Sequence, residues 1–114
     1  MEIEMKLYFY SIDDNEKFEK VLHCQELEAD ERLKTYKVHD GCDFWPYKSV
    51  IKKDELDEVI KDAFGIKFGI ILDSKNEEKA RILLDNYVEK QISFFEKNIR
   101  YFKRCLKAAK FISG

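Results

Sequence analysis

The feature that most constrains this chain is a long C-terminal stretch without any residue that breaks helices. From residue 75 to residue 112 the sequence contains neither proline nor glycine. Apolar residues recur there at alternating intervals of four and three, the spacing that lines one face of a coiled-coil helix. We therefore predict one amphipathic helix over 74–112. The residues expected to form its oligomer interface are Val88, Ile92, Phe95, Ile99, Phe102 and Leu106. A second column lies beside this interface and consists of Tyr87, Phe94, Tyr101 and Ala108.

The length of this helix raises the question of what covers its apolar face. Such a helix is about 55 Å long, whereas a compact domain of this size is only about 35 Å across. Either its last turns extend past the rest of the domain, or it breaks near residues 91–93 and folds into a hairpin. Soluble monomers rarely expose large apolar patches. We favour self-association through the helix and predict a homo-oligomer.

Strands are indicated along much of the chain before this helix. Several segments are rich in β-branched and aromatic residues and are separated by turn-forming residues such as those at 13–15 and 40–41. A nearly continuous apolar run is typical of a strand that is covered on both faces. The expected strands are 6–12, 18–27, 32–38 and 48–52, followed by the apolar run at 66–72.

Two helix boundaries carry local signals. Asp54 is a favourable N-cap, apolar residues follow it at helical spacing, and Gly65 suits a left-handed C-cap, so we predict a short helix over 54–64. Ser74 and Glu77 have the spacing of a capping box. This spacing predicts that the long helix begins at Ser74.

The chain therefore fits a single α+β domain over 1–114, since domains are typically about 100–150 residues long. Residues 1–73 are expected to form mainly an antiparallel β-sheet of four to five strands with the short helix. Residues 74–112 form the long C-terminal amphipathic helix.

Cysteine usage and charge indicate the compartment. The chain is 39% charged, and its three cysteines, Cys24, Cys42 and Cys105, are odd in number and widely spaced. This pattern is not a disulfide framework, so we expect reduced thiols. The N-terminus lacks the pattern of a signal peptide, and no apolar run approaches the ~18 residues of a membrane-spanning helix. We predict a cytoplasmic protein without a membrane partner.

Motifs for catalysis or metal binding are not evident. His39 and Cys42 are closely spaced zinc ligand types, but His23 and Cys24 are neighbours on a predicted strand and point to opposite faces. Only three ligands would then converge, whereas a structural zinc site needs four. Phosphate-binding glycine loops and nucleophile motifs are missing as well. We predict no catalytic residues, no metal and no cofactor, and therefore a protein that is not an enzyme.

The charge distribution points to the helix as a binding surface. Residues 1–65 hold ten basic and seventeen acidic residues, whereas residues 66–114 hold eleven and six. Arg100 and Arg104 are one helical turn apart, a spacing that suits a phosphate group; a solvated helix face is the alternative. An aromatic loop around Trp45 either recognises a partner or caps the core. The net negative charge of the whole chain argues against binding of duplex DNA. The candidate binding residues are Lys97, Arg100, Tyr101, Arg104, Lys107, Trp45, Tyr47 and Lys48.

Three segments carry a resemblance to a known group of proteins. They are Lys6-Leu-Tyr-Phe-Tyr, Lys34-Thr-Tyr-Lys37 and Ile51-Lys-Lys-Asp-Glu-Leu56. With the acidic strand between the first two and the Lys-rich long helix, they resemble small proteins of phages and other mobile elements of Gram-positive bacteria. The resemblance implies a counter-defence context, in which anti-CRISPR inhibitors and oligomeric sponges for nucleotide signals occur. The host cytoplasm is then the expected location.

These observations lead to one expected function. We expect a non-catalytic phage or mobile-element binding protein that sequesters or inhibits a partner. It is either an oligomeric nucleotide sponge or a protein inhibitor of a host defence nuclease. The alternative is a nucleic-acid-associated regulatory protein or a small enzyme without a recognisable motif.

Overall fold

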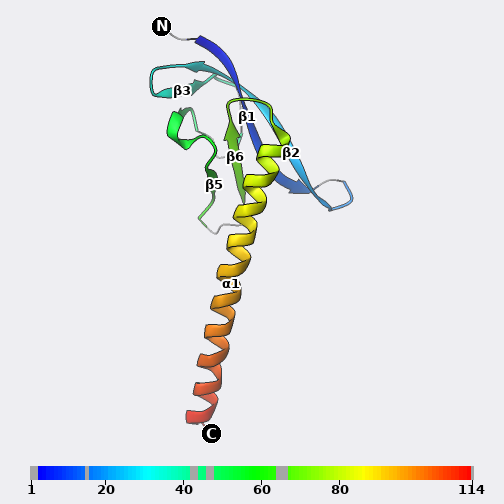
Figure 1. Cartoon of the computed structure of the whole chain (residues 1–114), viewed down its shortest axis with the longest axis vertical. Helices are drawn as coiled ribbons and strands as arrows, with labels where there is room; N and C mark the ends of the chain where they lie inside the picture. Colours follow the sequence, from blue (N-terminus) through cyan, green and yellow to red (C-terminus); the bar gives the residue numbers. More distant parts are fainter. Residues whose placement is uncertain (1–2, 15, 42–43, 46–47, 64–66, 114) are drawn as a thin grey trace. The chain divides into compact units, whose positions relative to one another are not determined.

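The computed structural model describes residues 3–14, 16–41, 44–45, 48–63 and 67–113, with side chains as far as Ala108. Within these residues, six β-strands, one 3₁₀ turn and one α-helix follow one another along the chain (Figure 1). The α+β class is therefore confirmed, with six antiparallel strands instead of four or five. The chain divides into two compact units, Met1–Leu84 and Asp85–Gly114. The first holds the sheet and the first turns of the helix.

The first two strands form one long hairpin. β1 (Ile3–Asp14) pairs antiparallel with β2 (Lys20–Glu31) along its whole length, from Ile3 opposite Glu31 to Asp14 opposite Lys20. Both strands are longer than their sequence patterns predicted. Figure 1 shows them as a twisted ribbon that extends beyond the neighbouring strands.

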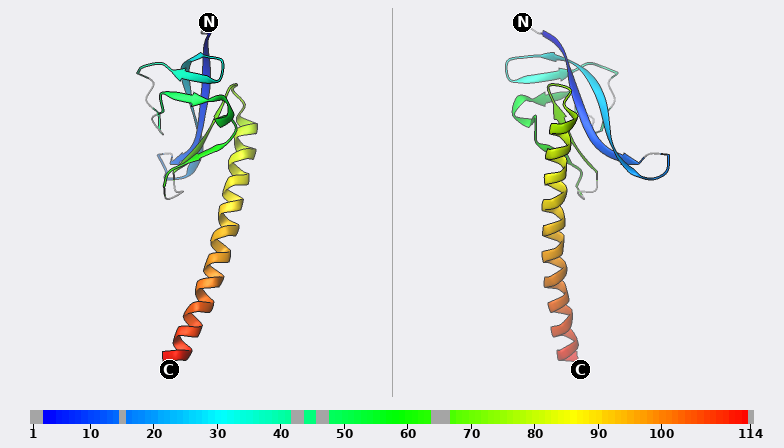
Figure 2. Two further views of the ribbon diagram at one scale, coloured as in Figure 1. Left: turned by 90° about the vertical axis from the view of Figure 1, so that its left-hand side faces the viewer. Right: turned by 45° about the vertical axis from the view of Figure 1, so that its right-hand side comes forward.

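Four short strands complete the sheet on both sides of this hairpin. The strand order is β4-β3-β2-β1-β6-β5, so β4 and β5 are the edges. Neighbouring strands are antiparallel throughout, and the sheet curls strongly (Figure 2). The bounds are β3 (Thr35–Val38), β4 (Val50–Lys52), β5 (Val59–Lys61) and β6 (Phe68–Leu72).

The predicted helix over 54–64 is wrong. Only one 3₁₀ turn, η1 (Lys53–Glu55), forms there, and the edge strand β5 follows it. Asp57 has a φ of 64°, in the left-handed region, which an α-helix cannot continue through. Its backbone N–H donates a hydrogen bond to the carbonyl of Ile71 on β6, at 3.1 Å. The apolar residues that follow therefore join the sheet.

Two apolar clusters lie on opposite faces of the sheet, because side chains alternate along each strand. Leu7 and Phe9 point into one cluster, and Tyr10 points into the other. β6 contributes to both, so its continuous apolar run reflects cover on both faces, as predicted. The first cluster contains Leu7, Phe9, Leu27, Ala29, Tyr36, Val38, Phe44, Ile51 and Ile71, and the second contains Tyr10, Ile70, Leu72, Ala80 and Leu84.

The helix α1 (Glu77–Ser113) is continuous, so the alternative with a break near residues 91–93 is wrong. Its predicted start at Ser74 is also wrong. The side-chain oxygen of Asn76 accepts a hydrogen bond from the backbone N–H of Lys79 at 3.0 Å, and its carbonyl accepts from Ala80 at 3.1 Å. Asn76 is therefore the N-cap, because its short amide satisfies a helical N–H that would otherwise lack a partner.

Candidate functional site

The second unit presents a wide apolar face on α1. Seven large apolar or aromatic side chains there are each more than half exposed. A face of this size is rare on a soluble monomer and is typical of an interaction surface. We call it the apolar face; its exposed members are Ile92, Phe94, Phe95, Ile99, Tyr101, Phe102 and Leu106.

Pairs of aromatic rings repeat along this face. Phe94 contacts Phe95 edge to face with the ring centroids 5.7 Å apart, and Tyr101 contacts Phe102 in the same way at 5.4 Å. The pairs are seven residues apart, so they lie nearly above one another on the helix. The two columns predicted from the sequence therefore form one aromatic surface.

Two polar side chains that sequence reasoning missed lie between these columns. Gln91 and Asn98 are half-buried, whereas their immediate neighbours in the sequence at 92–97 are exposed. The signal was available, because Leu84, Gln91, Asn98 and Cys105 are spaced by seven and form a column of their own. Their amides add hydrogen-bond donors and acceptors to an otherwise apolar side of the helix.

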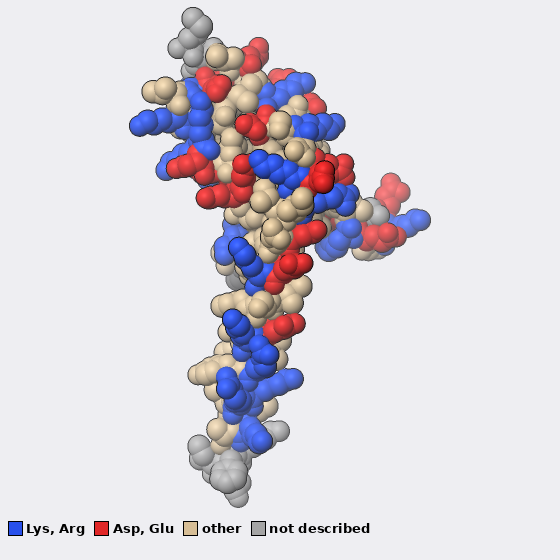
Figure 3. Space-filling view, in the orientation of Figure 1, with Lys and Arg blue, Asp and Glu red and all other residues tan. Residues whose placement is uncertain are grey.

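The opposite side of α1 is cationic. A shallow recess is lined by Lys97, Arg100, Lys103 and Arg104, and three of these four are predicted binding residues. Figure 3 shows Lys and Arg side chains following one another along this part of α1. No described residue forms an ion pair with any of them. We call this surface the cationic face; Lys107 is exposed on it as well.

The cationic face is suited to a phosphate. Arg100 and Arg104 are four residues apart and lie on one side of the helix. A guanidinium donates two parallel hydrogen bonds to phosphate oxygens, which a lysine ammonium cannot do. The lysines at 97 and 103 add positive charge to the same recess.

Tyr101 belongs to the border between the two faces. It does not line the recess, although it was a predicted binding residue; its ring packs on Phe102. The neighbouring thiol of Cys105, one turn further along the helix, raises the pKa of the Tyr101 phenol. At neutral pH this phenol is therefore a hydrogen-bond donor and an apolar stacking surface.

The aromatic loop belongs to the first unit. Phe44 is part of the first apolar cluster, and Trp45 packs against that cluster. The Trp45 ring lies 6.3 Å from that of Phe9, and the Lys67 ammonium lies 5.3 Å from its centroid. Lys48 forms an ion pair with Glu55 at 2.7 Å, which lowers the pKa of Glu55. These contacts favour the core-capping interpretation of the loop. Tyr47 lies outside the described residues.

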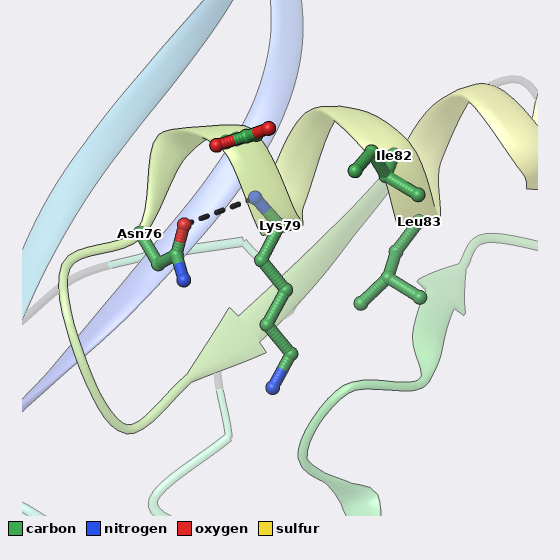
Figure 4. Close-up of a pocket in the computed structure, with 5 residues that line it drawn as sticks. Asn76, Lys79, Ile82 and Leu83 are labelled. Atoms are coloured by element: carbon green, nitrogen blue, oxygen red, sulfur yellow. Dashed lines mark hydrogen bonds between the residues drawn. The ribbon is translucent and has the colours of Figure 1, made fainter.

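A second recess lies at the start of α1, within the first unit (Figure 4). Ile82 and Leu83 provide its apolar wall, and Asn76 and Lys79 its polar rim. The Lys79 ammonium is paired with Asp57 at 3.0 Å, so its charge is neutralised within the chain. This recess is therefore less suited to an anion than the cationic face.

No protein-family model matches this chain, and neither a curated protein nor a solved structure is found to be similar to it.

Side chains of the types that bind metal ions are dispersed over the residues that the structure describes. No group of three or more His, Cys, Asp or Glu side chains there is arranged to hold a metal ion; Cys42 lies outside this part. Cys24 packs beside the buried Tyr10, and His23, its neighbour, is exposed. Burial, with a contribution from the Cys24 thiol, raises the pKa of Tyr10 to about 12, so this phenol stays neutral. In the described residues no helix is long and apolar enough to cross a membrane.

His39 is paired with carboxylates on β2. Its Nε2 lies 2.9 Å from Asp30, and its Nδ1 lies 3.8 Å from Glu28. The hydrogen bond to Asp30 is the main reason why the pKa of His39 is raised above its ordinary value, and the charges of Asp30, Glu4 and Glu28 add to it. This side chain was a candidate zinc ligand, but its neighbours identify it as a partner for carboxylates.

The raised pKa predicts a pH dependence of stability. Because the folded state binds this proton more tightly, His39 stabilises the fold below about pH 6.5, and this contribution is lost as the pH rises through the folded pKa. Urea unfolding at fixed protein concentration should show a loss of stability as the pH rises above about 6.5. We expect His39→Gln to reduce this loss and His23→Gln, a change of the exposed histidine on β2, to retain it. An unchanged pH profile in His39→Gln would contradict the prediction.

Proposed function

We propose that this protein is a non-catalytic binding protein that assembles through the apolar face of α1 and sequesters an anionic partner on the cationic face. The partner class that fits best is a nucleotide, and the resemblance to mobile-element proteins supports a role in counter-defence as a sponge for nucleotide signals. The observation that carries the proposal is the separation of two exposed surfaces, one apolar and one cationic, on the same helix.

The apolar face supports the assembly part of the proposal. Burying one exposed aromatic or aliphatic side chain of this size contributes roughly 1.5–3 kcal/mol. The five on the predicted interface, Ile92, Phe95, Ile99, Phe102 and Leu106, are already about half covered, so two copies together gain roughly 8–15 kcal/mol by burying the rest. This gain is of the same order as the cost of association, which is about 4–15 kcal/mol. A second copy is an occupant with the same apolar composition, so one surface serves both sides of the interface.

The cationic face supports the binding part of the proposal. Its recess has two guanidinium groups one turn apart and two ammonium groups, with no acidic residue from residue 97 onward. Such a surface attracts ligands that carry phosphate groups, because guanidinium groups can bind phosphate oxygens with two parallel hydrogen bonds. Tyr101 at its border is placed for stacking on a nucleobase.

Titration calorimetry with a panel of phosphate-bearing nucleotides tests the proposal. We expect at least one nucleotide to bind, and Arg104→Gln to weaken that binding about tenfold or more because a bidentate phosphate contact is lost. Lys90→Gln is the matched control, since residue 90 lies on the same side of α1 two heptads earlier and outside the recess. Sedimentation equilibrium of the same samples gives the mass. A monomer at micromolar concentration, or no binding across the panel, would reject the corresponding part of the proposal.

The acidic surface of the first unit favours a second candidate function. Residues 1–65 carry a net charge of −7, and Glu26 and Glu28 are exposed along β2. A protein inhibitor of a nuclease would use this surface to imitate a nucleic acid. Target binding would then survive Arg104→Gln, which separates this function from the sponge.

A further inference from the structure

We infer that two copies of α1 pair antiparallel, in the register that places Glu96 of each copy beside Lys103 of the other. The inference rests on the assembly proposed above and specifies its partner, direction and register. It uses only the part of α1 that belongs to the second unit. In heptad notation we place Ile92 at position a, so Phe95 is at position d.

Positions a and d form the line of contact between the two helices, which we call the seam, and the residues that occupy them are apolar. Positions a and d are occupied by Val88, Ile92, Phe95, Ile99, Phe102 and Leu106, at intervals of four and three. The last five of these are between 51% and 65% exposed, so another helix has access to them. A second helix with the same pattern can insert its side chains between them.

Side-chain volume distinguishes the two directions of pairing. In a parallel pair in register, each residue meets its own copy, so Phe95 meets Phe95 and Phe102 meets Phe102. In an antiparallel pair, each a residue meets a d residue of the other copy. With Ile99 opposite Phe102, Phe95 lies opposite Leu106, and each of these layers combines one aromatic ring with one branched aliphatic side chain. Alternating large and small residues across a seam fills it better than like on like.

Charge complementarity selects the same direction. Glu96 and Lys103 occupy e positions, which flank the e positions of the partner only when the helices are antiparallel. The register defined by Ile99 and Phe102 brings the two within one helical turn, twice per dimer by symmetry. Both side chains are exposed, and neither is in an ion pair with a described residue. A parallel pair would leave both without a charged partner, because their neighbours would be the amides of Gln91 and Asn98.

The other flank of the seam agrees with this arrangement. Its g positions hold Gln91, Asn98 and Cys105, none of which carries a formal charge. An antiparallel pair brings g positions together, and here that creates no repulsion between like charges. In the stated register Asn98 lies within one helical turn of Cys105 of the other copy, so uncharged groups meet on this flank.

A charge-swap experiment tests the pairing. Glu96→Lys alone places two cations together, and Lys103→Glu alone places two anions together, so each variant should associate about tenfold more weakly than the wild-type chain. Mixing the two variants should restore wild-type affinity, since both contacts become attractive again. Lys97→Glu is the control: it changes the charge equally but at an outward position, and mixing it with Glu96→Lys should not restore affinity. Equal recovery with the control would overturn the register.

Disulfide trapping reports the direction independently. In a background with the native cysteines replaced by serine, a mixture of Glu96→Cys and Lys103→Cys chains should give a cross-linked heterodimer. A mixture of Asn98→Cys and Lys103→Cys, which are neighbours only in a parallel pair, should give little. Trapping of the second mixture, or of neither in a sample that sediments as an oligomer, would overturn this inference and leave assembly intact. A monomer mass would overturn both.

Discussion

Replacing Gly69 by alanine is expected to lower the free energy of unfolding by about 3 kcal/mol, the upper part of the range for inserting atoms into a packed core. A Cβ atom at this position would lie 2.5 Å from Cζ of Phe9 and 2.8 Å from the carbonyl oxygen of Tyr10. The Phe9 ring is 4% exposed and packs edge to face on Phe44, so it has little space to withdraw. Urea unfolding followed by circular dichroism at fixed protein concentration measures the loss.

Gly41→Ala is the matched control for this prediction. Gly41 has a φ of 91°, but no atom of the described residues lies within 4 Å of a Cβ built there. Its replacement should cost about 1 kcal/mol through backbone strain alone. If Gly69→Ala were as stable as Gly41→Ala, the close approach of β6 to β1 would not be a tight constraint on the fold.

Leu84→Ala is expected to have an effect of similar size, about 3 kcal/mol, because it creates a cavity in the second apolar cluster. Leu84 is fully buried in that cluster with Ala80, from the same helix, and Ile70 and Leu72 from β6. Thermal unfolding should then occur about 10–15 °C lower than in the wild-type chain. The measurement reports how strongly the first turns of α1 are bound to the sheet.

Ile82→Ala provides the comparison on the same helix. Ile82 is 54% exposed, so its truncation should cost less than about 1 kcal/mol. Equal losses in the two variants would mean that the buried side of α1 contributes no more than its exposed side. That result would contradict the assignment of Leu84 to the core.

The strands and the long helix were predictable because their signals are local. The apolar run of β6 and the absence of breakers along α1 each identify one element, although α1 begins at Glu77 and not at Ser74. The error at residues 54–64 arose because apolar residues at helical spacing also fit a turn followed by a short strand. The left-handed conformation of Asp57 decides between the two, and it depends on a hydrogen bond to β6 that no local pattern reveals.

The candidate binding residues also differ in whether local spacing alone could predict their position. Lys97, Arg100 and Arg104 share one helix, so their spacing alone predicted that they lie together. Trp45 depends on the packing of a loop, and its contact with Phe9 required the fold. The pairing of His39 with Asp30 joins β2 to the segment after β3, and its sequence neighbourhood had indicated only a metal ligand. Contacts between distant segments were therefore the part that sequence reasoning could not supply.

The continuity of α1 has a thermodynamic consequence. One helix belongs to both compact units, and hydrogen bonds along a helix form cooperatively. Any free energy gained by ordering its distal turns therefore also protects the turn that holds Leu84 against β6. If those turns are ordered by a second chain, the melting temperature of the sheet rises with protein concentration. The concentration of the protein in its cell would then set the thermal stability of the sheet.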